Sequence, residues 1–469
     1  MTRRLFLLVA ILALSSSLLA QSVDSLRVWH YSSQHARESL DWVREGVIYE
    51  IYPRAFSPAG NFAGIEERLP ELKKLGVTIL WIMPIHPVGE LHRKGTLGSP
   101  YSVRDYYGIN PEFGTLADFK RLVARAHELG FHLLIDLVAN HTSWDSKLIT
   151  EHPEWFTKDS AGNIIPPNPD WTDVASLDYS HQGLRRYMIE MMKYWVRDIG
   201  IDGYRCDVAE RVPLDFWEAA RTALDSIKPV MMLAEGARPD HHLKAFDLSY
   251  SWDLYSLLGP LINGKRKPAD MDTLLKREAL AFPAGALRMR FSSNHDENAW
   301  DAPDVVKLGN DGAKLAAAFV NTLPGVPLLY NGQEAANAKP LRLFEKDTID
   351  WSRGDDFRKL YTTLFALRRS HPALTGSMVR IRTTSDDRVF AYARISGPDR
   401  VLVALNFSKE PFSGSLKIPS AQIVAPGHVS VRDLITGASE TVEVFPSGFF
   451  PVSLPPQGFK ILSVGSAPH

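Results

Sequence analysis

Residues 203–210, GYRCDVAE, place two charged side chains in a segment that otherwise has the composition of a buried strand. Side chains alternate between the two faces of a strand, so Arg205 and Asp207 would point the same way. Buried charges are costly unless they are paired or serve a site. The segment therefore predicts either a functional site at this strand or a structure other than a strand.

The surrounding sequence has the rhythm of repeated strand and helix units. Between residues 45 and 372, short β-branched runs alternate with amphipathic stretches, and Gly76, Gly130 and Gly200 stand where helices would end. About eight such units fit this length, which predicts an α/β fold of the (β/α)₈ TIM barrel type. A doubly wound open sheet is the alternative, but no G-x-G-x-x-G follows the first strand.

Two segments depart from this rhythm. Residues 142–182 are rich in Pro, Trp, Asp and Asn, which predicts a short insertion subdomain after the third strand. From residue 376 to 465 short alternating strands predict a C-terminal antiparallel β-sandwich domain. The barrel would then occupy residues 21–141 and 183–372.

Residues 1–20 have the layout of a secretory signal peptide. Arg3 and Arg4 precede an apolar run, LFLLVAILAL, and Ala20 ends the segment. The run is short for a membrane span, so we expect export to the periplasm or the medium, with no membrane attachment after cleavage. Cys206 is the only cysteine, which excludes an intrachain disulfide.

The charge balance excludes some partners. Removing Arg3 and Arg4 leaves 51 basic and 54 acidic residues, so the mature chain is nearly neutral. Such a chain offers no basic stripe for nucleic acid, and we expect a neutral or small partner. Nothing in the sequence sets the oligomeric state.

Polar residues gather where the predicted strands end. The C-terminal ends of all strands in a (β/α)₈ barrel lie on one face, so residues far apart in sequence would meet there. The candidate residues are Asp136, Asn140 and His141 at the third strand, Arg205 and Asp207 at the fourth, Glu235 at the fifth, and Asn294, His295 and Asp296 at the seventh.

Carboxylates without a cysteine cluster or a phosphate-binding loop indicate a polyhydroxylated substrate, since glycoside hydrolysis needs a pair of carboxylates at the scissile bond. We expect Arg205 to favour the ionised form of Asp207. Glu235 follows the apolar run VMML, and burial there would favour its protonated form. Opposite pKa shifts would then separate nucleophile from acid.

Several motifs resemble those of the α-amylase family of glycoside hydrolases, family 13. DLVANH, GYRCDVAE, MLAEG and FSSNHD are similar to its four main motifs in order, and GVIYEIYPRAF, SPYSVRDYYGINPEFGT and GVPLLYNGQE to its flanking motifs. The resemblance covers about residues 40–465. It implies a TIM barrel and a reaction that retains the α-configuration through a covalent glycosyl-enzyme.

Carried over by motif position, the resemblance makes Asp207 the nucleophile, Glu235 the general acid/base and Asp296 the stabiliser of the transition state. The remaining positions bind or support the substrate. Arg205 would hold Asp207, His141 and His295 would bind sugar hydroxyls, Tyr101 would stack on the sugar, and Asp136 would support these groups.

The sequence departs from the family pattern at sites that concern metal binding and sugar contact. Ser102 follows Tyr101 where the family often has aspartate. Asn140 could ligate calcium as in many α-amylases, but Ser176 stands where we align an acidic ligand, so we expect no required cofactor. Asp173 or Asp178 could supply the missing carboxylate.

After the nucleophile, VAERVP replaces the Lys-His pair of typical endo-acting α-amylases and is nearer to the cyclomaltodextrinase, neopullulanase and α-glucosidase branches. We therefore expect hydrolysis of α-1,4 bonds in malto-oligosaccharides or starch-derived α-glucans. Cleavage of α-1,6 bonds as well is an alternative that the sequence does not decide. A transglycosylase similar to amylosucrase or a maltosyltransferase, and an inactive glycan-binding barrel, are the alternatives.

Overall fold

The computed structural model describes residues 30–466, so the predicted signal peptide lies outside the described residues. Eight parallel strands close a barrel in the order β1-β10-β9-β8-β7-β6-β3-β2. Their bounds are β1 Ile48–Ile51, β2 Ile79–Ile82, β3 His132–Leu137, β6 Gly203–Cys206, β7 Met231–Ala234, β8 Leu248–Tyr250, β9 Leu287–Arg290 and β10 Val326–Tyr330.

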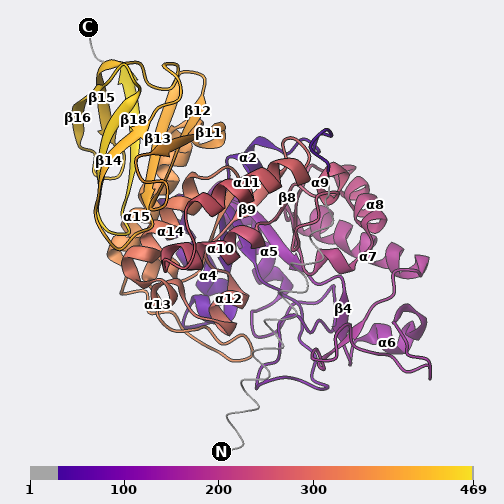
Figure 1. Cartoon of the computed structure of the whole chain (residues 1–469). Helices are drawn as coiled ribbons and strands as arrows, with labels where there is room; N and C mark the ends of the chain where they lie inside the picture. The colour runs from indigo at the N-terminus through magenta and orange to yellow at the C-terminus, as the bar shows by residue number, and fades with distance from the viewer. Residues whose placement is uncertain (1–29, 467–469) are drawn as a thin grey trace, which may run out of the picture.

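Helices follow the strands and cover the outside of the barrel (Figure 1). The longer ones are α4 Phe62–Leu75, α5 Leu116–Glu128, α7 Gln182–Tyr194, α8 Leu214–Asp225, α10 Trp252–Ile262, α11 Ala269–Ala281, α14 Gly309–Thr322 and α15 Asp355–Ser370. Shorter helices are α2 Asp41–Arg44, α3 Pro53–Phe56, α9 His241–Lys244, α12 His295–Trp300 and α13 Asp304–Lys307. The (β/α)₈ barrel predicted from the sequence is confirmed.

Apolar side chains explain why helix α5 packs against the barrel. Phe119, Leu122, Val123 and Ala126 recur at helical spacing in α5 and are all buried. Gly76 ends α4 with φ of 103°, a left-handed conformation that glycine adopts without strain. A separate apolar cluster that includes Ile48, Trp81 and Met289 fills the inside of the barrel.

Two strands differ from the sequence analysis. The sixth barrel strand, β8, was not recognised because it has only three residues, too few to show a period. Residues 203–210 are not one strand: β6 ends at Cys206, and Val208 has φ of 37°, which is incompatible with extended backbone.

The segment after β3 contains little regular structure. It holds β4 His141–Ser143, α6 Lys147–Glu151, the 3₁₀ turn η1 Pro153–Trp155 and β5 Val174–Ser176. Strands β4 and β5 pair antiparallel, with His141 opposite Ser176. The segment therefore forms its own small sheet beside the C-terminal ends of the barrel strands.

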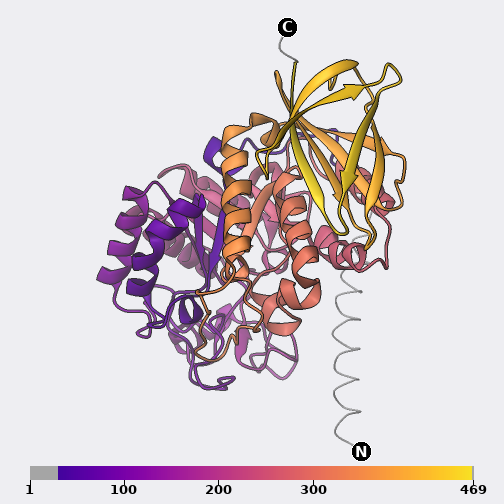
Figure 2. The same cartoon turned by 90° about the vertical axis from the view of Figure 1, so that its left-hand side faces the viewer.

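The C-terminal part is an antiparallel β domain at one end of the barrel (Figures 1 and 2). Its strand order is β16-β15-β18-β13-β12-β11-β14-β17. The bounds are β11 Ser377–Thr383, β12 Val389–Ser396, β13 Asp399–Asn406, β14 Phe412–Lys417, β15 Gly427–Asp433, β16 Ser439–Val444, β17 Phe449–Leu454 and β18 Phe459–Ser466. An apolar cluster shared by β12, β14, β15 and β17 packs its two layers together, as predicted for a sandwich.

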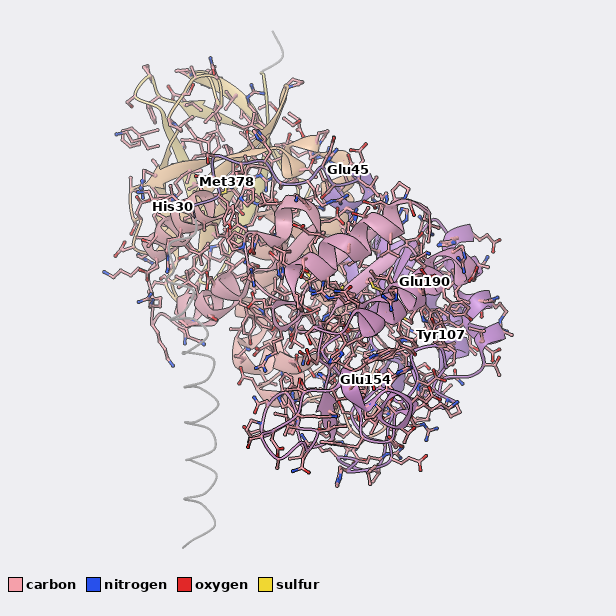
Figure 3. All side chains as sticks on the ribbon, turned by 90° about the vertical axis from the view of Figure 1, so that its right-hand side faces the viewer. His30, Glu45, Tyr107, Glu154, Glu190 and Met378 are labelled. Atoms are coloured by element: carbon pink, nitrogen blue, oxygen red, sulfur yellow. The ribbon has the colours of Figure 1, made fainter. Side chains whose placement is uncertain are left out.

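Helices α14 and α15 stand side by side next to the β domain in Figure 2. Tyr107 and Glu190 lie together on the opposite outer surface of the barrel, away from the β domain (Figure 3). Within residues 30–466, no helix combines the length and the apolar character that a membrane span needs.

Candidate active site

A single buried arginine connects the polar groups at the ends of the barrel strands. Arg205, in β6, is fully buried, and its Nη1 donates to Asp136 Oδ1 at 2.9 Å and to Asp207 Oδ1 at 2.8 Å. Its Nε donates to the hydroxyl of Tyr250 at 3.1 Å, and its Nη2 lies 2.9 Å from Glu235 Oε2. One guanidinium therefore contacts three carboxylates, of which Asp136 and Asp207 are buried, so Arg205 and Asp207 belong to a site at the end of the strand.

The break in the strand after Cys206 shapes the site. The chain turns at Val208, and the backbone N–H of Val208 donates to Glu235 Oε2 at 2.7 Å. A β-branched residue at positive φ is strained, and such strain persists where the surrounding structure enforces it, often at functional sites. Here the turn holds Glu235 beside Asp207.

The pKa values of Asp207 and Glu235 shift in the same direction. Burial raises the pKa of Asp207 to about 6 and that of Glu235 to about 7, and in each case the charge of Arg205 opposes the rise. The predicted opposite shifts are therefore wrong, because Arg205 contacts both carboxylates and burial outweighs it at each. Burial therefore favours the protonated form of both carboxyls.

His295 lies between two carboxylates. Its Nδ1 contacts Glu50 Oε1, and its Nε2 lies 2.9 Å from the hydroxyl of Tyr101 and 3.2 Å from Asp296 Oδ2. Burial alone would lower the pKa of His295, but Asp296 and Glu50 raise it well above its usual value. The imidazolium in turn lowers the pKa of Asp296 against the effect of burial, so Asp296 stays ionised.

Tyr101 completes this network. Its hydroxyl donates to Asp136 Oδ2 at 3.0 Å, and its ring stacks on the ring of His295 with centroids 5.4 Å apart. Ser102, at the position where the family often has aspartate, donates its hydroxyl to the carbonyl of Asp173 at 2.9 Å. Ser102 is therefore buried and anchors the segment after β3.

Glu50, in β1, is a residue that the sequence analysis missed. It is fully buried, and burial raises its pKa while His295 opposes the rise. A glutamate inside the apolar run VIYEIY was the available signal, since a charge on a buried parallel strand needs a partner. The partner could not be named, because His295 lies 245 residues away in the sequence.

His141 and Asn140 lie at the edge of the network. His141 Nδ1 accepts from the amide of Asn140 at 3.1 Å, and its ring also bonds the backbone of Tyr101. Burial lowers the pKa of His141 to about 4, so the ring is neutral near pH 7. The structure thus brings together Tyr101, Asp136, Arg205, Asp207, Glu235, His295 and Asp296, with Asn140 and His141 beside them.

The residues considered for calcium already have other partners. Asn140 uses its amide on His141, and Asp173 forms an ion pair of 2.9 Å with Lys94. Asp178 binds the backbone N–H of Ser180. Among residues 30–466 no three His, Cys, Asp or Glu side chains gather as metal ligands would.

Comparison with known proteins identifies the family. The family model described as the alpha amylase catalytic domain matches residues 44–171 and 168–363, more than half of the chain. The chain belongs to the α-amylase family. The four motifs that resemble this family are thus those of a member, and their polar residues form the network described above.

Individual members of the family are similar over most of this chain. An alpha-amylase of Haloarcula japonica is 30% identical over 84% of this chain, which spans 59% of the length of that relative. A cyclomaltodextrinase of Geobacillus thermopakistaniensis is 27% identical over 92% of this chain and 78% of its own length. The crystal structure of a noncanonic maltogenic alpha-amylase from Thermotoga neapolitana superposes with a TM-score of 0.82 at 35% identity, covering 90% of this chain and 99% of its own.

Proposed function

We propose that this α-amylase family member is a retaining glycosidase that hydrolyses α-1,4 bonds of malto-oligosaccharides or starch-derived α-glucans. The observation that carries the proposal is the bridge from Arg205 to both Asp207 and Glu235. A shared guanidinium favours a short spacing of the two carboxylates. Retaining enzymes hold theirs about 5–5.5 Å apart, whereas inverting enzymes need about 6.5–9.5 Å.

The roles are those that the motif positions imply, and they fit a retaining mechanism. The carboxylate of Asp207 attacks the anomeric carbon, while the proton of Glu235 passes to the departing glycosidic oxygen as that bond breaks. Water then attacks the anomeric carbon of the ester, Glu235 takes the proton of the water, and Asp207 leaves. Two inversions restore the α-configuration. Ionised Asp296 stabilises the positive charge that develops at the sugar.

The substrate class rests on the relatives and on the chemistry of the site. The similar proteins are named for α-glucan substrates, and carboxylates gathered at one site of a nearly neutral chain suit a neutral sugar. We further propose that residues 1–20 direct export and that the mature enzyme works outside the cytoplasm.

The test is a proton NMR time course with maltoheptaose. Early release of the α-anomer with shorter products would support the proposal, and early release of the β-anomer would contradict it. Products longer than maltoheptaose would favour the transglycosylase. Asp207→Asn and Glu235→Gln should each abolish turnover, whereas Glu190→Gln on the outer surface of α7 should not.

A further inference from the structure

Two loops at the rim of the barrel are joined to each other. Residues 94–97 follow β2, and Phe344 and Glu345 belong to the long segment that follows β10. The N–H of Leu97 donates to the carbonyl of Phe344 at 3.0 Å, and the N–H of Thr96 donates to Glu345 Oε1 at 3.0 Å. We call residues 94–97 with Phe344 and Glu345 the rim bridge.

The rim bridge is tight where the two loops meet. Gly95 has φ of 66°, and a Cβ added there would lie 2.6 Å from the Cβ of Phe344. Only glycine allows both this backbone conformation and so close an approach. The orange loop after β10 and the violet loops after β2 reach the same end of the barrel in Figures 1 and 2.

A buried arginine supports the rim bridge from below. Arg54, in α3 directly after β1, donates from Nη1 to the carbonyls of Gly98 at 2.7 Å and Leu343 at 3.2 Å, and from Nη2 to that of Leu97 at 2.9 Å. Tyr52 donates its hydroxyl to the carbonyl of Leu343 at 2.8 Å. Both loops are therefore fixed to the segment that leaves β1.

The rim bridge continues to its neighbours on both sides. The ring of Phe344 contacts Trp300 of α12, with centroids 5.6 Å apart, and Trp300 follows catalytic Asp296 on the same short helix. On the other side Lys94 Nζ forms an ion pair of 2.9 Å with Asp173 and binds the carbonyl of Asp170. A continuous wall thus runs from the loop after β9 to the segment after β3.

The barrel order places this wall opposite the acid. In the closed barrel β1 lies between β2 and β10, and β7, which carries Glu235 at its end, is the strand four positions away in either direction. The leaving part of the substrate must lie at Glu235, because Glu235 protonates the departing oxygen. The wall therefore stands across the barrel from Glu235, on the side toward which the donor part of the substrate would extend.

We propose that the rim bridge closes the donor end of the cleft, so that the enzyme removes short pieces of one length from the non-reducing ends of α-glucan chains. This inference rests on the proposed function. With the donor end closed, only a chain end can reach the wall, and the remainder of the chain extends past Glu235. An interior bond of a long chain could not be placed at Asp207.

The test compares maltoheptaose with maltoheptaose whose non-reducing end carries an ethylidene group on O4 and O6. We expect the uncapped sugar to give one short product from the first minutes. The capped sugar should react at least about 100-fold more slowly, because its non-reducing end cannot bind against the wall. Equal rates, or a mixture of product lengths from the start, would overturn the inference. If neither sugar were cleaved, the proposed function itself would fail, and the inference with it.

A variant tests the rim bridge directly. The double change Thr96→Ala and Glu345→Ala removes the side-chain contacts across the bridge. We expect longer products and measurable cleavage of the capped sugar, whereas Glu190→Ala, on the distant outer surface, should behave as the parent protein does. The comparison of the two sugars with the unaltered enzyme decides the inference even if the double variant does not fold.

Discussion

At the scale of single residues, the site depends on how one positive charge is shared. Arg205 contacts Asp136, Asp207 and Glu235, so burial and attraction compete at each carboxylate. The nucleophile must be ionised and the acid protonated for the first step, which sets a window of pH.

The dependence of kcat/KM on pH should be bell-shaped. Activity should rise as pH increases through about 6, where Asp207 loses its proton, and fall above about 7, where Glu235 loses its own. Initial rates on a maltoheptaoside at low substrate concentration measure this profile. Full activity well above pH 7 would contradict the assignment of Glu235 as the acid.

Glu50 should act as a positioning residue. In Glu50→Gln the imidazole of His295 loses one of its two carboxylate partners, so its pKa falls and Asp296 is held less firmly. We expect kcat to fall by about 10- to 100-fold with a smaller change in KM, because a small misplacement of groups at the reacting centre costs up to about 100-fold. The pH profile should also change, which a loss of folded protein would not produce. An unchanged kcat would show that Glu50 serves only the fold.

At the scale of elements, the helices on the outside follow local signals that the sequence displays. Thr115 caps α5: its Oγ1 accepts from the N–H of Asp118, and Asp118 Oδ2 accepts from the N–H of Thr115. Such a reciprocal pair satisfies two backbone donors that the first turn of a helix leaves without partners.

Loss of this cap should affect stability but not activity. Thr115→Ala should lower the free energy of unfolding by about 1 kcal/mol. The midpoint of urea unfolding would measure the change, and kcat should stay constant because α5 lies outside the barrel. Thr273→Ala, at an exposed position within α11, is the matched control. It should not lower the free energy of unfolding, since alanine favours the helix. Equal effects of the two changes would contradict the cap.

At the scale of the whole molecule, the barrel and the β domain share apolar contacts. Phe319 of α14 contacts Phe390 of β12 and Phe407, with ring centroids 5.9 and 5.6 Å away. Arg394 of β12 also donates to the carbonyl of Thr322 at 2.7 Å. Apolar residues of both parts belong to one buried cluster.

We expect one cooperative transition for the chain in scanning calorimetry. Phe319→Ala should lower the free energy of unfolding by about 3–5 kcal/mol, as large-to-small changes in a core do, and move that single transition to lower temperature. Leu280→Ala, at an exposed position in α11, should leave the transition in place. Two separate transitions in the parent protein would show that the parts fold independently.

The sequence by itself determined the barrel and the face on which its candidate catalytic groups lie. Repeated strand and helix patterns predict a parallel barrel, and such a barrel must place all C-terminal strand ends on one face. Asp207, Glu235 and Asp296 could therefore be assigned to one site although they are distant in the sequence. A strand of three residues such as β8 carries too little pattern to be predicted.

Only the tertiary structure decided how the groups are charged and what surrounds them. The pKa values of Asp207 and Glu235 follow from burial and from the distance of each to one guanidinium, which no local pattern records. The pairing of Glu50 with His295, and the rim bridge opposite Glu235, likewise join segments that meet only when the barrel closes. Local sequence fixes periodicity and turns, whereas electrostatics and loop contacts depend on distances in space between residues remote along the chain.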